Sequence, residues 1–357
     1  MPSFRTGKVL DVIATLTGGT QRLSVSIDGV TREALLYPRW AAPAEPGDEV
    51  VVNTTAVDLG LGTGDADFVV WNQSVTNYDS PSGGHIMKLR YTPAQTDVLA
   101  VEAQESPHHE TMASARSLDK TPVIATSLHS QLLPALCGLR EHNPEAVVVY
   151  VMTDGAALDA GYSNTLRRLR ELGWLSGVIT TGHAVGGDLE AVTLHSGLLA
   201  ARHVLDADLV VAGVGPGVVG TGTPFGTTAL DLGTISLATT SLGGRSIVCV
   251  RLSDSDPRPR HRGLSHHVVS ALGWVAPSVD HEAACIVVPT GWGSRVANEV
   301  GSWRVVEHDA SNVLERLREA AALDLTSSHM GRGPDEDALF FESAAAAGSY
   351  AAGLVGT

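Results

Sequence analysis

A glycine-rich run, GVGPGVVGTGTPFG at 213–226, has the composition of an anion-binding loop. Within it Gly215, Gly217 and Gly220 have the GxGxxG spacing, in which glycines let backbone N–H groups approach an anion at the start of a helix. The candidate ligand-binding residues of the run are Gly215, Gly217, Gly220, Thr221, Gly222 and Thr223. A dinucleotide site is disfavoured, because the next acidic residue at a predicted strand end, Asp254, lies 34 residues past Gly220, whereas about 20 is usual. The alternative is a loop that packs tightly beneath another segment.

A second segment, PRPRHRGLSHH at 257–267, is basic in a chain whose formal net charge is −15. We call it basic segment 257–267. Its candidate ligand-binding residues are Arg258, Arg260 and Arg262, because guanidinium groups bind carboxylate and phosphate in a bidentate manner. His261 and His267 are candidate acid–base catalysts, because imidazole titrates near neutral pH. The alternative is an exposed loop whose arginines pair with acids of a partner subunit.

Three further catalytic candidates follow other predicted strands. Asp154 comes directly after one strand, and His183 stands in a glycine-flanked loop after the next. Asp188 lies five residues beyond His183. A carboxylate near a histidine can orient the imidazole or assist its proton transfer. As alternatives, Asp154 caps a helix or binds a metal, and Asp188 is the N-cap of the following helix.

No metal-binding motif is present. The sequence has no CxxC pair, and HEAAC at 281–285 departs from the HExxH motif at its last position. His266 and His267 are neighbours, so on a helix their side chains diverge by about 100° and we do not expect them to share a role. We therefore predict no metal ligands, although histidine and aspartate side chains at strand ends could still assemble a divalent site. The sequence motifs do not identify a cofactor.

The elements that position these residues begin with a small β domain. Residues 22–28 alternate between polar and apolar types, which is the period of a half-buried strand. The dipeptide Asp28-Gly29 favours a hairpin turn after it. Further strands are predicted at 8–16, 30–37, 49–57 and 67–71. The sequence thus predicts a small β-barrel over residues 1–76, followed by a linker with connecting strands over 77–120.

From residue 121 to residue 357 the chain alternates between apolar strands and helical segments. This alternation predicts an α/β fold with a doubly wound, mainly parallel, Rossmann-like sheet. The predicted strands are 123–127, 147–152, 177–181, 209–213, 247–252, 285–288 and 303–306. The predicted helices are 129–141, 162–173, 188–204, 225–242, 264–274, 310–322 and 334–347. Because ligands bind beyond the carboxyl ends of parallel strands, we expect the candidate residues to converge at that edge.

The overall composition excludes several classes of protein. With 43% hydrophobic and 18% charged residues, the sequence favours a sizeable buried core over disorder. Its acidic balance disfavours binding to nucleic acid or to an anionic membrane, both of which need a basic face. The three scattered cysteines, together with the lack of a signal-peptide pattern and of any membrane-length apolar run, predict a cytoplasmic protein with reduced thiols. We also expect a homo-oligomer, a dimer.

Seven segments together resemble a family of bacterial domains of unknown function, family 3866, which occurs in actinobacteria and Firmicutes. They are GGHIMKLRYTPAQ at 83–95, TSLHSQLLPAL at 126–136, MTDGAAL at 152–158, TGHAVGGDLEAV at 181–192, GVGPGVVGTGTPFG at 213–226, RPRHRGLSHH at 258–267 and MGRGPDEDALFF at 330–341. The resemblance implies that the chain is a complete member of this family. It implies no activity.

The residues therefore favour an enzyme that acts on a small anionic metabolite, phosphorylated or carboxylated, by transfer or hydrolysis. The glycine-rich run and the arginines would hold the anion, and a histidine would move the proton. One rival hypothesis is a non-catalytic sensor or scaffold that binds a nucleotide-like ligand in the same pocket. Another makes basic segment 257–267 an interface between subunits.

Overall fold

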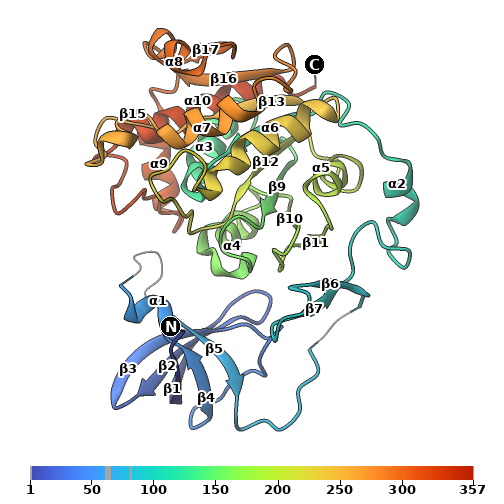
Figure 1. Ribbon diagram of the computed structural model, residues 1–357, viewed down its shortest axis with the longest axis vertical. Coiled ribbons are helices and arrows are strands. Elements are labelled where there is room, and N and C mark those ends of the chain that lie inside the picture. The colour runs from blue at the N-terminus through green and yellow to red at the C-terminus, as the bar shows by residue number, and fades with distance from the viewer. Residues whose placement is uncertain (1, 61–65, 81–82, 357) are drawn as a thin grey trace. The chain divides into compact units, whose positions relative to one another are not determined.

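The computed structural model describes residues 2–60, 66–80 and 83–356. The chain divides into two compact units, Met1–Leu99 and Ala100–Thr357 (Figure 1). The first unit contains a β-barrel and a short hairpin, and the second is an α/β unit.

The barrel of the first unit is closed and has five strands. They are β1 (Phe4–Thr15), β2 (Gln21–Ile27), β3 (Val30–Leu36), β4 (Glu49–Asn53) and β5 (Asp67–Asn72), in the order β1-β2-β3-β5-β4. Neighbouring strands are antiparallel except β3 and β5, which are parallel. The alternation of residue types in β2 marks the inward face, because Leu23, Val25 and Ile27 are buried and the residues between them are half-buried.

Local side-chain chemistry decides the ends of the barrel strands. Asp28 and Gly29 form the turn between β2 and β3 with φ values of 52° and 78°, as the hairpin signal predicts. The predicted strand 49–57 is too long, because Asn53 Oδ1 accepts hydrogen bonds from the N–H and hydroxyl of Thr55 at 3.1 and 2.6 Å. These bonds compete with the sheet ladder, and the chain turns into the short helix α1 (Thr55–Asp58). Later in this unit, β6 (Ile86–Lys88) and β7 (Thr96–Val98) form an antiparallel hairpin.

The second unit is built on an eight-stranded sheet in which every neighbouring pair is parallel. The order across the sheet is β11-β10-β9-β12-β8-β13-β16-β17. The strands are β8 (Pro122–Thr126), β9 (Val148–Thr153), β10 (Gly177–Thr180), β11 (Leu189–Glu190), β12 (Leu209–Val214), β13 (Arg245–Cys249), β16 (Ala284–Pro289) and β17 (Val305–His308). Every residue of β9 and β12 is buried, which explains why these strands are continuous apolar runs in the sequence.

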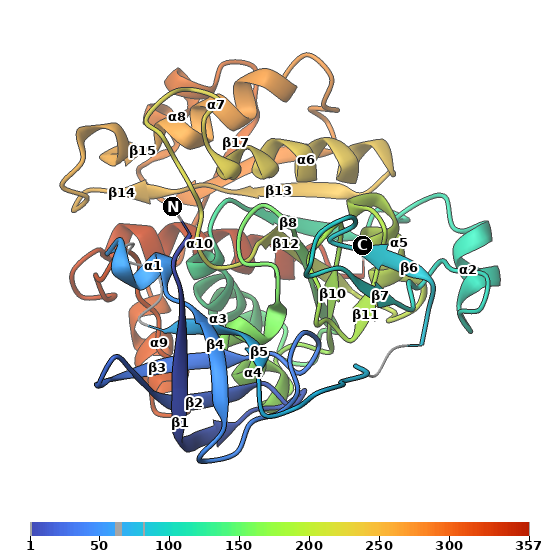
Figure 2. The same cartoon turned by 60° about the horizontal axis from the view of Figure 1, so that its bottom comes forward.

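Helices cover both faces of this sheet. One face packs against α2 (His109–Ser114), α5 (Leu194–His203), α6 (Asp231–Ser241), α7 (His266–Val275) and α8 (Gly293–Val300). The other packs against α3 (Leu132–His142), α4 (Asn164–Glu171), α9 (Val313–Ala321) and α10 (Ala338–Ala352). Figure 2 shows α6, α7 and α8 on one side of β13 and α10 on the other. The structure confirms the predicted fold, a doubly wound parallel sheet preceded by a small β-barrel.

The predicted helices begin later than expected, and the delay is largest for two of them. In the predicted helix 188–204, residues Leu189–Glu190 form β11 beside β10, and α5 starts only at Leu194, where Thr193 Oγ1 caps it by accepting from Ser196 N at 3.1 Å. The predicted helix 225–242 starts as α6 at Asp231, after a single 3₁₀ turn. In both cases a loop with its own internal hydrogen bonds replaces the expected first turns. The structure also contains α8, which lies in a segment with no predicted helix.

The strand order creates a switch point beside β8. The chain leaves β8 for α3 on one face of the sheet and leaves the neighbouring strand β12 for α6 on the opposite face. The two loops diverge at the carboxyl ends of these strands, which is where open α/β sheets bind ligands.

Among the described residues, no helix combines the length and apolar character that crossing a bilayer requires.

Candidate functional site

Basic segment 257–267 follows β13 and leads into α7. It contains a 3₁₀ turn, Pro259–His261, and the strand β15 (Gly263–Leu264), which pairs with β14 (Leu252–Ser253). Ser265 is the N-cap of α7, and its hydroxyl accepts from the N–H of His267 at 3.3 Å. The same hydroxyl lies 2.8 Å from Nδ1 of His261. One serine therefore positions two of the candidate histidines.

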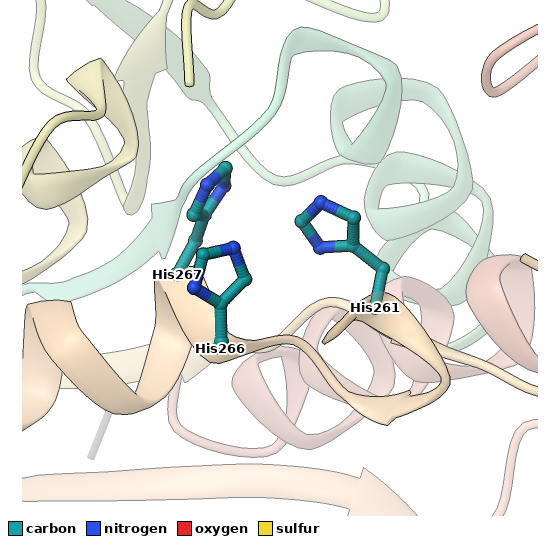
Figure 3. Close-up of side chains that lie close together, drawn as sticks. All are labelled: His261, His266 and His267. Carbon is teal, nitrogen blue, oxygen red and sulfur yellow. The ribbon is translucent and has the colours of Figure 1, made fainter. Parts of the chain in front are cut away.

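Three imidazole rings gather at the start of α7: His261, His266 and His267 (Figure 3). Each ring offers one nitrogen, and these three nitrogens lie within 4.8 Å of one another. The ring centroids are 4.3 Å apart for His266 and His267, and 5.0 and 4.9 Å from His261 to each of them. We call this group the histidine cluster. The expectation that His266 and His267 diverge is wrong, because both lie in the first turn of the helix, where no preceding turn restricts the side chains.

The histidine cluster is largely buried. His261 and His267 are 1% and 6% exposed, and His266 is half-buried. The Nε2 atoms of His266 and His267 are buried and have no hydrogen-bond partner among the described residues. A buried polar atom without a partner usually costs free energy, so such an atom points to a function.

The imidazoles of the cluster are uncharged near neutral pH. Burial, aided by electrostatic repulsion from His266 in its protonated form and from Arg251, lowers the pKa of His267 to about 4. Burial and Arg251 lower the pKa of His261 to about 3. Each of these rings therefore keeps one lone pair available at pH 7.

The three arginines of basic segment 257–267 have different surroundings. Arg258 is paired within the chain, because its guanidinium donates to both oxygens of Asp256 at 3.0 and 2.9 Å. The side chains of Arg260 and Arg262 are exposed and have no ion-pair or hydrogen-bond partner in the described part of the chain. After burial, Arg260 is the next cause that lowers the pKa of His266, and it also lowers the pKa of His267, so its charge lies close to the cluster.

Asp256 holds this region together. It is fully buried and accepts hydrogen bonds from Arg251 at 2.8 Å and Arg332 at 3.3 Å as well as from Arg258. Arg332 also donates to Asp337 at 3.1 Å, which in turn accepts from Ser253. Sequence analysis missed this network, because its members are spread over more than 80 residues and the motif MGRGPDEDALFF was the only local sign of it.

His329 joins this network from the C-terminal part of the chain. Its ring stacks on Phe340 with centroids 4.1 Å apart, and its Nδ1 lies 3.4 Å from the hydroxyl of Ser130, just beyond β8. Burial, together with Arg251, lowers the pKa of His329 to about 3. Sequence analysis did not select His329, although the segment MGRGPDEDALFF begins at the next residue.

The glycine-rich run folds into a hairpin over residues 219–228, which we call the glycine-rich hairpin. Thr228 N donates to Val219 O at 3.0 Å, and Thr221 N donates to Gly226 O at 2.8 Å. The hydroxyls of Thr221 and Thr223 lie 2.9 Å apart and bond within the hairpin. These hydroxyls were predicted to bind a ligand. In the structure they stabilise the loop itself.

Gly220 brings the hairpin against the histidine cluster. A Cβ at this position would lie 2.6 Å from Cε1 and 2.8 Å from Nε2 of His267, so only glycine allows this approach. Thr227, opposite Gly220 in the hairpin, places its hydroxyl 3.5 Å from Nδ1 of His267. The two segments singled out in the sequence thus meet at the carboxyl edge of the sheet.

The other predicted glycines serve the course of the loop. A Cβ at Gly215 would lie 2.7 Å from the carbonyl oxygen of Ala157, so the loop passes close to the one that follows β9. Gly217 has a φ of +98° and Gly222 a φ of +80° at the turns of the chain. This geometry differs from a dinucleotide-binding loop, because the hairpin separates the glycines from the start of α6.

The start of α6 is occupied by an acidic residue that sequence analysis did not select. Asp231 accepts a hydrogen bond from the hydroxyl of Thr153 at 2.6 Å. Burial raises the pKa of Asp231, the bond from Thr153 lowers it, and the charge of Asp154 raises it further. A carboxyl group at this helix start disfavours the binding of an anion there.

The remaining catalytic candidates lie outside the histidine cluster. Asp154 accepts from the backbone N–H of His183 at 3.0 Å, so the two loops after β9 and β10 meet through the main chain of His183. Asp188 pairs with Arg170 and accepts from Val178 N at 2.8 Å, beside the first half of β10. The alternative in which Asp188 caps a helix is wrong, because β11 follows it directly.

A sequence model of the family described as "Protein of unknown function (DUF3866)" matches residues 33–348. The chain belongs to this family. The match covers nearly the whole chain and includes all seven segments that carry the resemblance, from 83–95 to 330–341.

No curated protein matches this DUF3866 protein. Among solved structures, YjeQ from Thermotoga maritima is similar over 56% of this chain and 65% of that chain, with 12% sequence identity and a TM-score of 0.13. The matched region thus spans less than two thirds of YjeQ.

Proposed function

We propose that this DUF3866 protein is an enzyme that transfers or hydrolyses a group on a small anionic metabolite, phosphorylated or carboxylated. The substrate would lie at the carboxyl edge of the sheet, beside the histidine cluster and Arg260. The position supports this assignment, because β12 and β13 supply the two segments and flank β8 at the switch point.

The observation that carries the proposal is the unpaired charge of Arg260. Arg251, Arg258 and Arg332 each form an ion pair with Asp256, and Arg332 forms a second one with Asp337. Arg260 has no such partner among the described residues, yet its charge acts on His266 and His267. A free guanidinium beside a buried polar cluster is suited to bind phosphate or carboxylate.

The histidine cluster supplies the chemical group. An uncharged imidazole can accept a proton from water or from a hydroxyl nucleophile. Because the pKa values of His261 and His267 lie well below neutral pH, either ring is a weak base until a bound anion beside it raises its pKa. His267 lies against Gly220, so the hairpin that covers the cluster also restricts the access of water. We therefore assign the base to the histidine cluster. A role for Asp154 and His183 stays a prediction.

Arg260→Ala tests the anion site. We expect millimolar phosphate to raise the melting temperature of the wild-type protein, because a ligand that binds only the folded state stabilises it by about 2.7 kcal/mol at 100 times its Kd. The variant should lose most of this stabilisation while keeping its melting temperature in phosphate-free buffer, since Arg260 has no partner to lose. Differential scanning calorimetry with and without phosphate measures both quantities.

Arg316→Ala is the matched control, because Arg316 is an exposed arginine whose partner, Glu319, lies three residues further along the same helix. It should retain the full response to phosphate. If the wild-type protein gains nothing from phosphate, succinate or a sugar phosphate, the anion site is refuted. If an anion binds through Arg260 but no small phosphate ester or carboxylic ester turns over, the sensor hypothesis replaces the enzyme.

A further inference from the structure

We propose that the histidine cluster is a binding site for one divalent transition-metal ion, with Zn²⁺ as its preferred occupant. His261, His266 and His267 would each contribute one imidazole nitrogen. This inference goes beyond the proposed function and changes one part of it. Once all three imidazole nitrogens bind the metal, none of them is free to accept a proton, and a metal-bound water would serve as the base instead.

The spacing of the three nitrogens is close to that of a metal centre. Nitrogens bound to Zn²⁺ at about 2.0–2.1 Å in a tetrahedral arrangement lie about 3.3 Å apart. The nitrogens of the cluster lie within 4.8 Å of one another, so binding a metal requires their separations to shorten by up to about 1.5 Å. Figure 3 shows His266 and His267 side by side at the start of α7, with the ring of His261 facing them from the preceding loop.

A second, independent observation is the state of the ring nitrogens. His267 is 6% exposed, and its Nε2 has no partner among the described residues; the buried Nε2 of His266 has none either. Two other buried ring nitrogens of the α/β unit, Nδ1 of His281 and Nε2 of His329, also have no partner in the described part of the chain, but neither ring belongs to the cluster. Within the cluster the unpartnered nitrogens lie beside one another, where a bound cation would satisfy them together.

The surroundings of the rings resemble the outer shell of a metal site. Metal-binding histidines usually bond through their second nitrogen to a protein group, which fixes the tautomer and the direction of the ring. Nδ1 of His261 lies 2.8 Å from the hydroxyl of Ser265, which leaves Nε2 for a ligand. Nδ1 of His267 lies 3.5 Å from the hydroxyl of Thr227 in the same manner.

The ligand set selects the class of metal. Imidazole suits Zn²⁺, Ni²⁺, Cu²⁺ and Fe²⁺, whereas Mg²⁺ and Ca²⁺ prefer oxygen ligands. No cysteine or carboxylate belongs to the group of described residues that forms the cluster. Three protein ligands leave a fourth position for water or for an anion held by Arg260, which is the arrangement of catalytic rather than structural zinc.

The experiment is a titration of the full-length, metal-stripped protein with Zn²⁺ by isothermal calorimetry. A parallel titration with Co²⁺ uses its visible absorption, which reports tetrahedral coordination. We expect one equivalent to bind to the wild-type protein. His266→Gln and His267→Gln should each weaken binding by more than about 100-fold, beyond the effect of losing an outer-shell partner.

His195→Ala is the matched control, because His195 is exposed and lies outside the cluster on α5. It should bind Zn²⁺ like the wild-type protein. Circular dichroism establishes that each variant is folded; if His267→Gln is not, His266→Gln decides, since His266 is only half-buried.

The proposal is overturned if the wild-type protein binds no Zn²⁺, or if both glutamine variants bind it as tightly as His195→Ala. The proposed function is tested separately through Arg260. A wild-type protein that binds Zn²⁺ but gains no stability from phosphate would refute the anion site alone, and one that responds to phosphate but binds no Zn²⁺ would refute the metal site alone.

Discussion

Asp256→Asn is expected to lower the free energy of unfolding of the α/β unit by about 3–5 kcal/mol, the usual cost of removing one partner from a buried ion pair. Asp256 is fully buried, and the side chain of Arg251 is only 5% exposed. Without the carboxylate, Arg251 keeps its charge in a site that excludes water. Arg258 and Arg332 lose an acceptor at the same time. Urea denaturation followed by circular dichroism, which reports mainly the helices of this unit, measures the loss.

The same substitution should change the response to acid. Burial raises the pKa of Asp256, but hydrogen bonds from Arg258 and the charges of Arg251 and Arg258 outweigh burial and hold the pKa far below its ordinary value of 3.8. A carboxyl group with a depressed pKa stabilises the folded state fully above the unfolded pKa, and this contribution is lost as the pH falls below it. The wild-type protein should therefore lose more stability than Asp256→Asn between pH 6 and about pH 3.

Asp335→Asn is the control for this prediction. Asp335 also pairs with an arginine, Arg318, at 2.6 Å, but the two side chains are 73% and 64% exposed. Exposed pairs typically contribute less than about 1 kcal/mol, so this variant should stay near the wild-type stability. If both variants lost the same free energy of unfolding, burial would add nothing to the contribution of the Asp256 ion pairs.

Gly348→Ala is expected to destabilise the α/β unit by about 1–3 kcal/mol or more, as overpacking of a core does. Gly348 lies in α10 where this helix crosses α3, and a Cβ there would stand 1.8 Å from the carbonyl oxygen of Ala135. Gly138 makes the reciprocal approach from α3, with its Cβ position 2.1 Å from Ala345 O. Because the obstacle is backbone, the two helices must move apart. The melting temperature and the urea midpoint report the change.

Gly273→Ala, in the same unit, is expected to have the opposite effect on stability. Gly273 lies inside α7, and a Cβ there would meet nothing within 4 Å. Alanine is a better helix former than glycine by about 1 kcal/mol, so this variant should be slightly more stable than the wild-type protein. If Gly348→Ala also gained stability, the close crossing of α3 and α10 would be wrong.

Most of the fold could be predicted from the sequence, because its signals are local. The seven apolar runs became seven of the eight parallel strands, since strands that are covered on both faces of a sheet are mostly apolar. The strand the sequence did not predict, β11, has only two residues, Leu189 and Glu190, which is too short for any period to show. Errors at helix starts, as at Leu194 and Asp231, arose where turns compete with the first helical hydrogen bonds.

The candidate site was predicted only in part. Its two main segments follow strands β12 and β13, and the topology rule was enough to bring them to one edge. The rule could not foresee that the hydroxyls of Thr221 and Thr223 would bond within the hairpin. Nor could it foresee that the rings of His266 and His267 would converge, because rotamers in a first helical turn depend on the atoms packed around them.

By itself, therefore, the sequence determined the barrel, the parallel α/β unit and the edge at which polar groups collect, because hydrophobic period and turn chemistry act over a few residues. Only the tertiary structure decided which groups there are available to a ligand. Arg258 is bound to Asp256, and Arg332, distant in the sequence, shares the same carboxylate, while Arg260 has no partner among the described residues. The partner of a charge depends on distance in space, which the spacing of residues along the chain does not reveal.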